Sequence, residues 1–156
     1  MSNAAVKGEL KAALKVPKEL VRRIEAHGEE TYPYECCGAI LGREREGAGA
    51  AREVVDLMPL ENRRNDSPRN RFEVTPDDVR MAEKAAREKK IDLIGWYHSH
   101  PDCAAVPSEF DRDHAWPWYS YIIVSVEQRK ARDMRSWRLQ DDRAAYDVER
   151  IEAAES

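Results

Sequence analysis

Two stretches of the chain space their apolar residues as an amphipathic helix does, three or four positions apart. The first covers residues 17–28, with Pro17 suited to the first turn and the end expected near Gly28. The second covers residues 75–90, with Thr75 as an N-cap and a basic end that suits the helix dipole. The two apolar stripes consist of Leu20, Val21 and Ile24, and of Val79, Ala82 and Ala86.

Several shorter apolar runs predict strands. Residues 119–126 are the most strand-like, because β-branched and aromatic residues dominate them. Residues 91–100 form a second run, which Pro101 ends by removing a ladder donor. A final strand or short helix is expected around residues 146–151. The other predicted strands are residues 35–42, 52–60, 72–74 and 133–139.

These elements predict one α/β or α+β domain, a mixed sheet with two main flanking helices. The length of 156 residues is usual for a single domain, which we place at residues 17–151. Residues 1–16 have a weak pattern and are expected to form a mobile lead-in, in which Ser2-Asn3-Ala4 resembles a cloning scar. The polar run 61–71 is expected to be a solvent-facing loop.

Charge and composition exclude several classes of partner. The net charge is −4 and basic residues alternate with acidic ones, so we expect no nucleic-acid partner. No apolar run approaches the ~20 residues that span a bilayer, and no signal-peptide pattern is present, so we expect no membrane association. The three cysteines are an odd number and two are adjacent, which suits a reducing cytoplasmic setting.

A pair of histidines is the main candidate for chemistry. His98 and His100 lie two residues apart in a predicted strand, so they share a face and could hold one ion. A catalytic zinc site needs a third protein ligand and keeps a fourth position for water. Asp111 can supply a carboxylate, since Ser108 to Asp111 reads as the first turn of a helix. The same Ser-x-x-Asp spacing also fits a capping box, a purely structural role. Rival ligands are Asp102, Cys103, Asp113 and His114.

A hydrolytic zinc site also needs a proton acceptor. The residue between the histidines is Ser99, so the acid must come from elsewhere in the chain. Glu35 is the best candidate, because it stands at the entrance to an apolar strand behind Tyr32 and Tyr34, where it can be shielded from water. An ordinary turn glutamate has the same sequence context, so a structural role stays open.

Taken together, these motifs resemble the JAMM (MPN-plus) metalloprotease domain, in its stand-alone prokaryotic form. His98-x-His100-Pro101, six residues and then Ser108-x-x-Asp111 match the family's metal signature. Glu35-Cys36-Cys37-Gly38 is similar to its catalytic-glutamate segment, and residues 62–76 are similar to its middle segment. The resemblance runs from about residue 17 to about residue 139.

The resemblance implies a curved mixed sheet in a cytidine deaminase-like arrangement. It implies Zn²⁺ held by His98, His100 and Asp111, a zinc-bound water activated by Glu35, and Ser108 as a donor to the tetrahedral intermediate. The implied reaction is hydrolysis of the amide bond after the C-terminal Gly-Gly of a partner, a small β-grasp ubiquitin-like or sulfur-carrier protein. The alternative is a non-catalytic MPN-type scaffold, although such scaffolds usually lack the metal ligands that this chain has.

Overall fold

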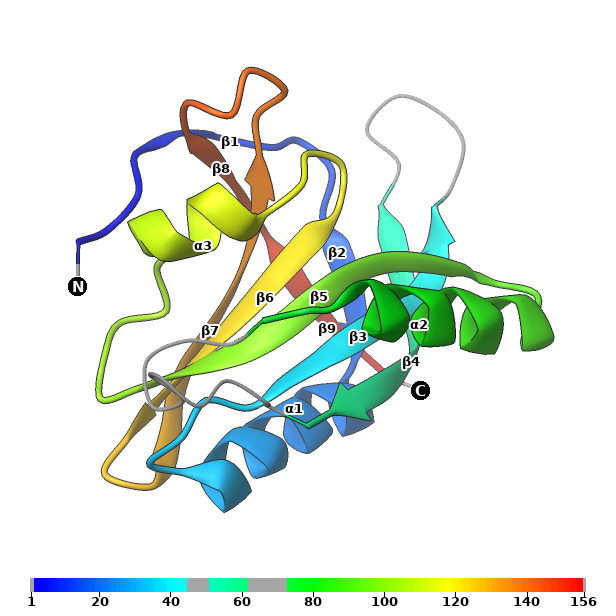
Figure 1. The fold of residues 1–156 in the computed structure, drawn as a ribbon, viewed down its shortest axis with the longest axis horizontal. Helices are drawn as coiled ribbons and strands as arrows, with labels where there is room; N and C mark the ends of the chain where they lie inside the picture. Colours follow the sequence, from blue (N-terminus) through cyan, green and yellow to red (C-terminus); the bar gives the residue numbers. More distant parts are fainter. Residues whose placement is uncertain (1, 45–50, 62–72, 156) are drawn as a thin grey trace.

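The computed structural model describes residues 2–44, 51–61 and 73–155, whose path is drawn in Figure 1. The loop predicted at 61–71 lies outside these residues except for Glu61. The strand predicted at 72–74 is wrong where the structure describes it, because Glu73 and Val74 belong to no strand. Three helices are described: α1 (Lys18–Thr31), α2 (Pro76–Glu88) and α3 (Glu109–His114). The described strands are β1 (Val6–Glu9), β2 (Leu14–Pro17), β3 (Cys37–Glu44), β4 (Arg52–Leu60), β5 (Asp92–Pro101), β6 (Ser120–Glu127), β7 (Lys130–Leu139), β8 (Tyr146–Glu149) and β9 (Ile151–Ala154).

The described strands form one mixed sheet in the order β1-β8-β7-β6-β5-β3-β4-β2-β9. The strand β5 lies near its middle, antiparallel to β3 and parallel to β6. The strands β8 and β9 stand near opposite ends of this order, yet Arg150 alone separates them in the sequence. The chain therefore brings the two edges of the sheet together, and the sheet curls (Figure 1). The predicted curved mixed sheet with flanking helices is confirmed.

The first residues differ from the expected lead-in. β1 pairs in parallel with β8, and β2 lies between β4 and β9. Each strand has four residues, and β2 buries only Leu14 and Val16. So few inward positions give no recognisable alternation, which is why the sequence pattern missed both strands.

The helices α1 and α2 cover two separate apolar clusters of the sheet. Ile24 of α1 packs with the cluster that includes Ile122, and Ala82 and Ala86 of α2 pack with the cluster that includes Ile123. The helix α1 continues past Gly28, where we had expected it to end. A Cβ at Gly28 would lie 2.9 Å from the side chain of Val126, so this glycine allows close packing on β6. No described helix is both long and apolar enough to cross a membrane.

Candidate metal centre

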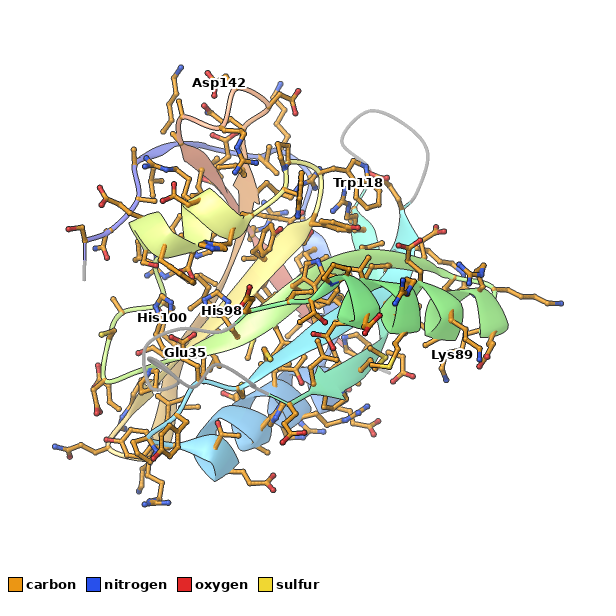
Figure 2. The ribbon with its side chains drawn as sticks, viewed as in Figure 1. Glu35, Lys89, His98, His100, Trp118 and Asp142 are labelled. Atoms are coloured by element: carbon orange, nitrogen blue, oxygen red, sulfur yellow. The ribbon has the colours of Figure 1, made fainter. Side chains whose placement is uncertain are left out.

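The two histidines and one aspartate form a compact cluster at the end of β5. The Nε2 atoms of His98 and His100 are 3.1 Å apart. Asp111 approaches from α3, with Oδ1 3.4 Å from His98 Nε2 and Oδ2 3.2 Å from His100 Nε2. Both imidazoles are buried, and the aspartate side chain is 9% exposed. Figure 2 shows the two histidines side by side with Glu35 next to them.

The spacing of these atoms fits a tetrahedral zinc ion. Zinc bonds of 2.0–2.2 Å to nitrogen and oxygen separate neighbouring ligand atoms by about 3.4 Å. The three measured separations lie between 3.1 and 3.4 Å. A three-ligand set also leaves one tetrahedral position open, which is the arrangement of catalytic zinc sites.

The protonation states also suit a cation. Burial lowers the pKa of His98, which favours the neutral imidazole, although Asp111 partly opposes this shift. Burial would raise the pKa of Asp111, but the two histidines outweigh that effect and hold it below its usual value. Neutral histidine and ionised aspartate are the forms that bind a metal.

A backbone contact orients His100. Its Nδ1 lies 2.9 Å from the carbonyl oxygen of Ala104, which can only accept a hydrogen bond. Neutral His100 therefore carries its hydrogen on Nδ1 and presents a bare Nε2 to Asp111 and His98. Such contacts behind the ligating nitrogen fix the tautomer of metal-binding histidines.

The capping box predicted as a structural alternative is present, and it also positions the carboxylate. Ser108 caps α3 by accepting a hydrogen bond from the Asp111 backbone nitrogen at 3.1 Å. The carboxylate of Asp111 accepts one from the Ser108 backbone nitrogen at 2.8 Å. Asp111 thus serves as a cap while its Oδ2 also faces His100, so the structural and ligand roles are compatible. Ser108 is buried, 2% exposed, in the same turn.

Glu35 reaches the same place from the neighbouring strand. Cys37 is paired with His98 across β3 and β5, and the Ser99 backbone nitrogen donates to the Cys36 carbonyl at 3.2 Å. Because the strands are antiparallel, the residue two positions before Cys37 lies opposite the residue two positions after His98. Glu35 is therefore level with His100, and its side chain is on the same face of the sheet as the two histidines. Glu35 is 2% exposed, which is rare for a carboxylate away from a functional or paired setting.

The rival ligands lie elsewhere among the described residues. Only His98, His100 and Asp111 form a group with ligand atoms within 4.8 Å of one another in the described part of the chain. His114 Nδ1 lies 2.9 Å from the Phe110 carbonyl oxygen, and Asp102 binds Tyr32. The cysteine Cys103 is exposed, and Asp113 lies on the surface beside Arg112.

Two supports of α3 were not foreseen from the sequence. The guanidinium of Arg143 donates to the carbonyls of Ala115 at 2.7 Å and Arg112 at 3.1 Å, the last turn of the helix. At the other end, Asn3 forms a β-bridge with Ser108, and the Glu109 backbone nitrogen donates to Ser2. Both contacts join positions far apart in the sequence, so no local pattern signals them.

An aromatic cavity of about 640 Å³ lies on the face of β5 that carries the two histidines. Trp96 lines it and stands two residues before His98 on the same strand face, about 7 Å away along β5. His114 and Trp116 line the α3 side, and Val79 of α2 lines the opposite side. Trp118 lies outside the lining of this cavity and stacks against Arg52, 4.3 Å from the guanidinium carbon to the ring centre.

Two of the three cysteines are core residues. Cys36 and Cys37 are each 1% exposed at the start of β3. Burial raises the pKa of the Cys36 thiol to about 12, so it stays protonated at neutral pH. A thiol in that state is a poor nucleophile and a poor ligand.

The chain resembles known proteins over most of its length. Residues 17–140 match a family model described as prokaryotic homologs of the JAB domain. A desampylase of Haloferax volcanii is 36% identical over 98 residues, 62% of this chain and 66% of the relative. A Thermus thermophilus protein named "Probable TtuB-protein conjugate cleaving protease" is 31% identical over 118 residues, 76% of this chain and 74% of the relative. The chain therefore spans slightly less than two thirds of the first of these relatives.

A solved structure has a similar fold. A protein from Desulfitobacterium hafniense, known from a solution structure, is 31% identical with a TM-score of 0.77. The similarity covers 92% of this chain and 94% of that one. The curled sheet and its helices are thus shared over nearly the whole domain.

Proposed function

The chain belongs to the prokaryotic JAB-domain family, and on that premise we propose that it is a zinc-dependent hydrolase that cleaves the amide bond after the C-terminal Gly-Gly of a ubiquitin-like or sulfur-carrier protein. The observation that carries the proposal is the convergence of His98, His100 and Asp111, with the buried Glu35 level with His100 on the adjacent strand. The names of two relatives, a desampylase and a conjugate-cleaving protease, support hydrolysis of protein conjugates.

His98, His100 and Asp111 would hold the zinc. Zinc at this position would polarise the scissile carbonyl and lower the pKa of a water at its open position to about 7. His100 is oriented by Ala104 and Asp111 by the cap of α3, so both ligands are fixed before any ion arrives. Preorganised ligands lose little conformational entropy when the ion binds.

Glu35 would move the proton. Its carboxylate accepts a proton from the attacking water and returns it to the leaving amine as the carbon–nitrogen bond breaks. Asp111 already faces both imidazoles, so Glu35, level with His100 in the register, is the carboxylate left for this role. Ser99 of β5 holds the backbone next to Glu35, because Cys36 donates its backbone N–H to the Ser99 hydroxyl at 2.8 Å.

Ser108 would stabilise the oxyanion of the tetrahedral intermediate. Its Oγ accepts a hydrogen bond from the Asp111 backbone, which leaves its own O–H to donate. A preorganised donor of this kind contributes about 3 kcal/mol to transition-state stabilisation. Because the cap holds the serine, the hydroxyl does not need to reorganise as charge develops.

The cavity lined by Trp96 and Trp116 suits the tail that leads to the scissile bond. Its volume of about 640 Å³ lies within the usual range for ligand sites. A flexible Gly-Gly tail could run extended from this cavity to the metal cluster, held partly by backbone hydrogen bonds. Glycines have no side chain, so they suit the approach to buried groups such as Glu35 and Ser108.

Cleavage of tailed carriers tests the proposal. Small β-grasp carriers that end in Gly-Gly, extended by a few residues at the C-terminus, are incubated with the zinc-loaded protein and read by intact mass. We expect mass loss that stops at the second glycine, ceases with a chelator and returns with added zinc. The matched control is the His98→Ala variant. Cleavage that persists in this variant or in chelator would contradict the proposal, as would the absence of cleavage from every carrier.

A further inference from the structure

Glu35 sits in a short connection between α1 and β3 whose two ends are held differently. At the α1 end, the Tyr34 backbone nitrogen donates to Thr31 at 2.9 Å, and the Thr31 hydroxyl donates to the Tyr34 carbonyl at 3.0 Å. At the β3 end, the Cys36 backbone nitrogen donates a hydrogen bond to the Ser99 hydroxyl, and the Cys36 carbonyl accepts one from the Ser99 backbone nitrogen. These contacts hold the residues on either side of Glu35, and the position of the whole connection also depends on Tyr32, which stands at the end of α1.

One side chain in this connection crosses to the strand that carries the histidines. The hydroxyl of Tyr32 donates to Oδ2 of Asp102 at 2.6 Å, a short contact of the charge-assisted kind. Asp102 follows β5 directly and lies two residues after His100. The hydrogen bond from Tyr32 therefore links the segment that contains Glu35 to the end of β5, the strand that contains His98 and His100.

Asp102 is itself firmly fixed. Its backbone nitrogen donates to the Val126 carbonyl at 2.7 Å, and its Oδ1 accepts from the Gln128 backbone nitrogen at 2.8 Å. Its backbone has φ 55°, a left-handed conformation that aspartate and asparagine tolerate better than most residues. Asp102 thus joins the connection after α1, the end of β5 and the turn after β6.

We propose that Tyr32 and Asp102 are positioning residues that act as a clamp and fix Glu35 relative to the metal cluster. The inference rests on the proposed function of Glu35. Neither residue is part of the group formed by His98, His100 and Asp111, so we expect the clamp to act on proton transfer more than on metal binding. A displacement of about 1 Å at a catalytic group can lower a rate by about 100-fold, so a loosened connection slows turnover strongly.

The Tyr32→Phe variant tests the clamp, because it removes one hydroxyl and keeps the ring. We expect kcat on a cleaved carrier to fall about tenfold, while KM and zinc affinity, measured by competition with a chromogenic chelator, stay within about twofold. Backbone hydrogen exchange of residues 32–36 is expected to rise with no change in the cores. The matched control is Tyr34→Phe, which removes an exposed hydroxyl from the same connection and should leave every readout unchanged.

Substitutions of Asp102, which accepts the hydrogen bond from Tyr32, complete the test. Asp102→Gly removes the carboxylate and suits the left-handed backbone, so it should lower kcat as Tyr32→Phe does. The double variant should be no slower than the worse single variant, because both substitutions remove the same hydrogen bond between Tyr32 and Asp102. Asp102→Asn keeps an oxygen for Gln128 and an amide that can bond the tyrosine oxygen, and should restore most of the rate.

Three outcomes would overturn the clamp: unchanged kcat in Tyr32→Phe, multiplying effects in the double variant, or equal losses of kcat and zinc affinity. Hydrogen exchange separates this inference from the proposed function. If the parent cleaves no carrier, the proposed function fails, and the clamp is then judged by exchange alone. Increased exchange confined to residues 32–36 and 101–104 supports it, and unchanged exchange contradicts it.

Discussion

Cys37 of β3 and His98 of β5 face each other across the antiparallel ladder, and this register brings the two halves of the candidate site together. It sets Glu35, two residues before Cys37, on the face from which His98 and His100 point. A shift of one residue would turn either set of side chains to the opposite face of the sheet. The pairing of these strands is therefore the main determinant of the site geometry.

Replacement of the Asp111 carboxylate is expected to weaken zinc binding strongly. The Asp111→Asn variant keeps an oxygen to cap α3 but loses the charge that offsets the cation, so zinc affinity should fall more than 100-fold. Metal content is measured on the purified variants after dialysis. The control is His114→Ala, because His114 lies on the same helix but outside the ligand group. Zinc retained by Asp111→Asn, or lost from His114→Ala, would contradict the assignment.

Ser108→Gly separates the cap from the hydroxyl donor. Glycine at an N-cap costs only a few tenths of a kcal/mol relative to serine. We therefore expect the free energy of unfolding to change little, while kcat falls by about 100-fold through loss of the oxyanion donor. Chemical unfolding and steady-state kinetics on a cleaved carrier measure the two effects. A rate loss no larger than the stability loss would assign Ser108 a structural role only.

Arg143 should support metal affinity from a distance. The helix α3 has six residues and so has little intrinsic stability, and Arg143 holds the carbonyls of its last turn. Arg143 has φ 63°, so Arg143→Asn removes the guanidinium with little backbone strain. Zinc affinity is expected to fall about tenfold, in line with the effect of other supporting residues. Arg135→Asn, on the exposed part of β7, is the control, and an equal loss there would refute the prediction.

The three cysteines should react very differently with iodoacetamide. Cys103 is exposed, whereas Cys36 and Cys37 are buried and the Cys36 pKa is raised to about 12. At pH 8 the folded protein should gain a single adduct, and the other two should form only after unfolding. Intact mass and peptide mapping give the number and position of adducts. Rapid labelling at Cys36 would show that the start of β3 is not closed to solvent.

Much of the architecture could be predicted from local pattern. The helix at Pro76–Glu88 was marked by a cap, a proline and early acids, and its capping box is present. The central strands were marked by apolar and β-branched runs long enough to read. The strands β1 and β2 were missed, because none of the four residues of β1 and only two of the four in β2 are buried, which gives too little periodicity. Gly28 was misread, since a glycine that allows helix packing looks the same as one that ends a helix.

Only part of the candidate site could be predicted from the sequence. His98, His100 and Asp111 lie within fourteen positions, so strand and helix geometry could suggest a cluster. Glu35 is distant in sequence. Its place at the entrance to an apolar strand made it a candidate, and its resemblance to a known segment connected it to the histidines. The clamp of Tyr32 with Asp102 and the cap by Arg143 depend on tertiary contacts between side chains, which neither periodicity nor a motif encodes.

The measurement that tests the central claim most directly is the turnover and zinc content of Glu35→Gln beside the parent protein. Glutamine matches glutamate in size but cannot accept the proton, and the ligand group is unchanged. We predict stoichiometric zinc in both proteins, and a rate of carrier cleavage in the variant at least 100-fold below the parent rate. Cleavage at the parent rate with zinc content unchanged would contradict the assignment of Glu35 as the general base.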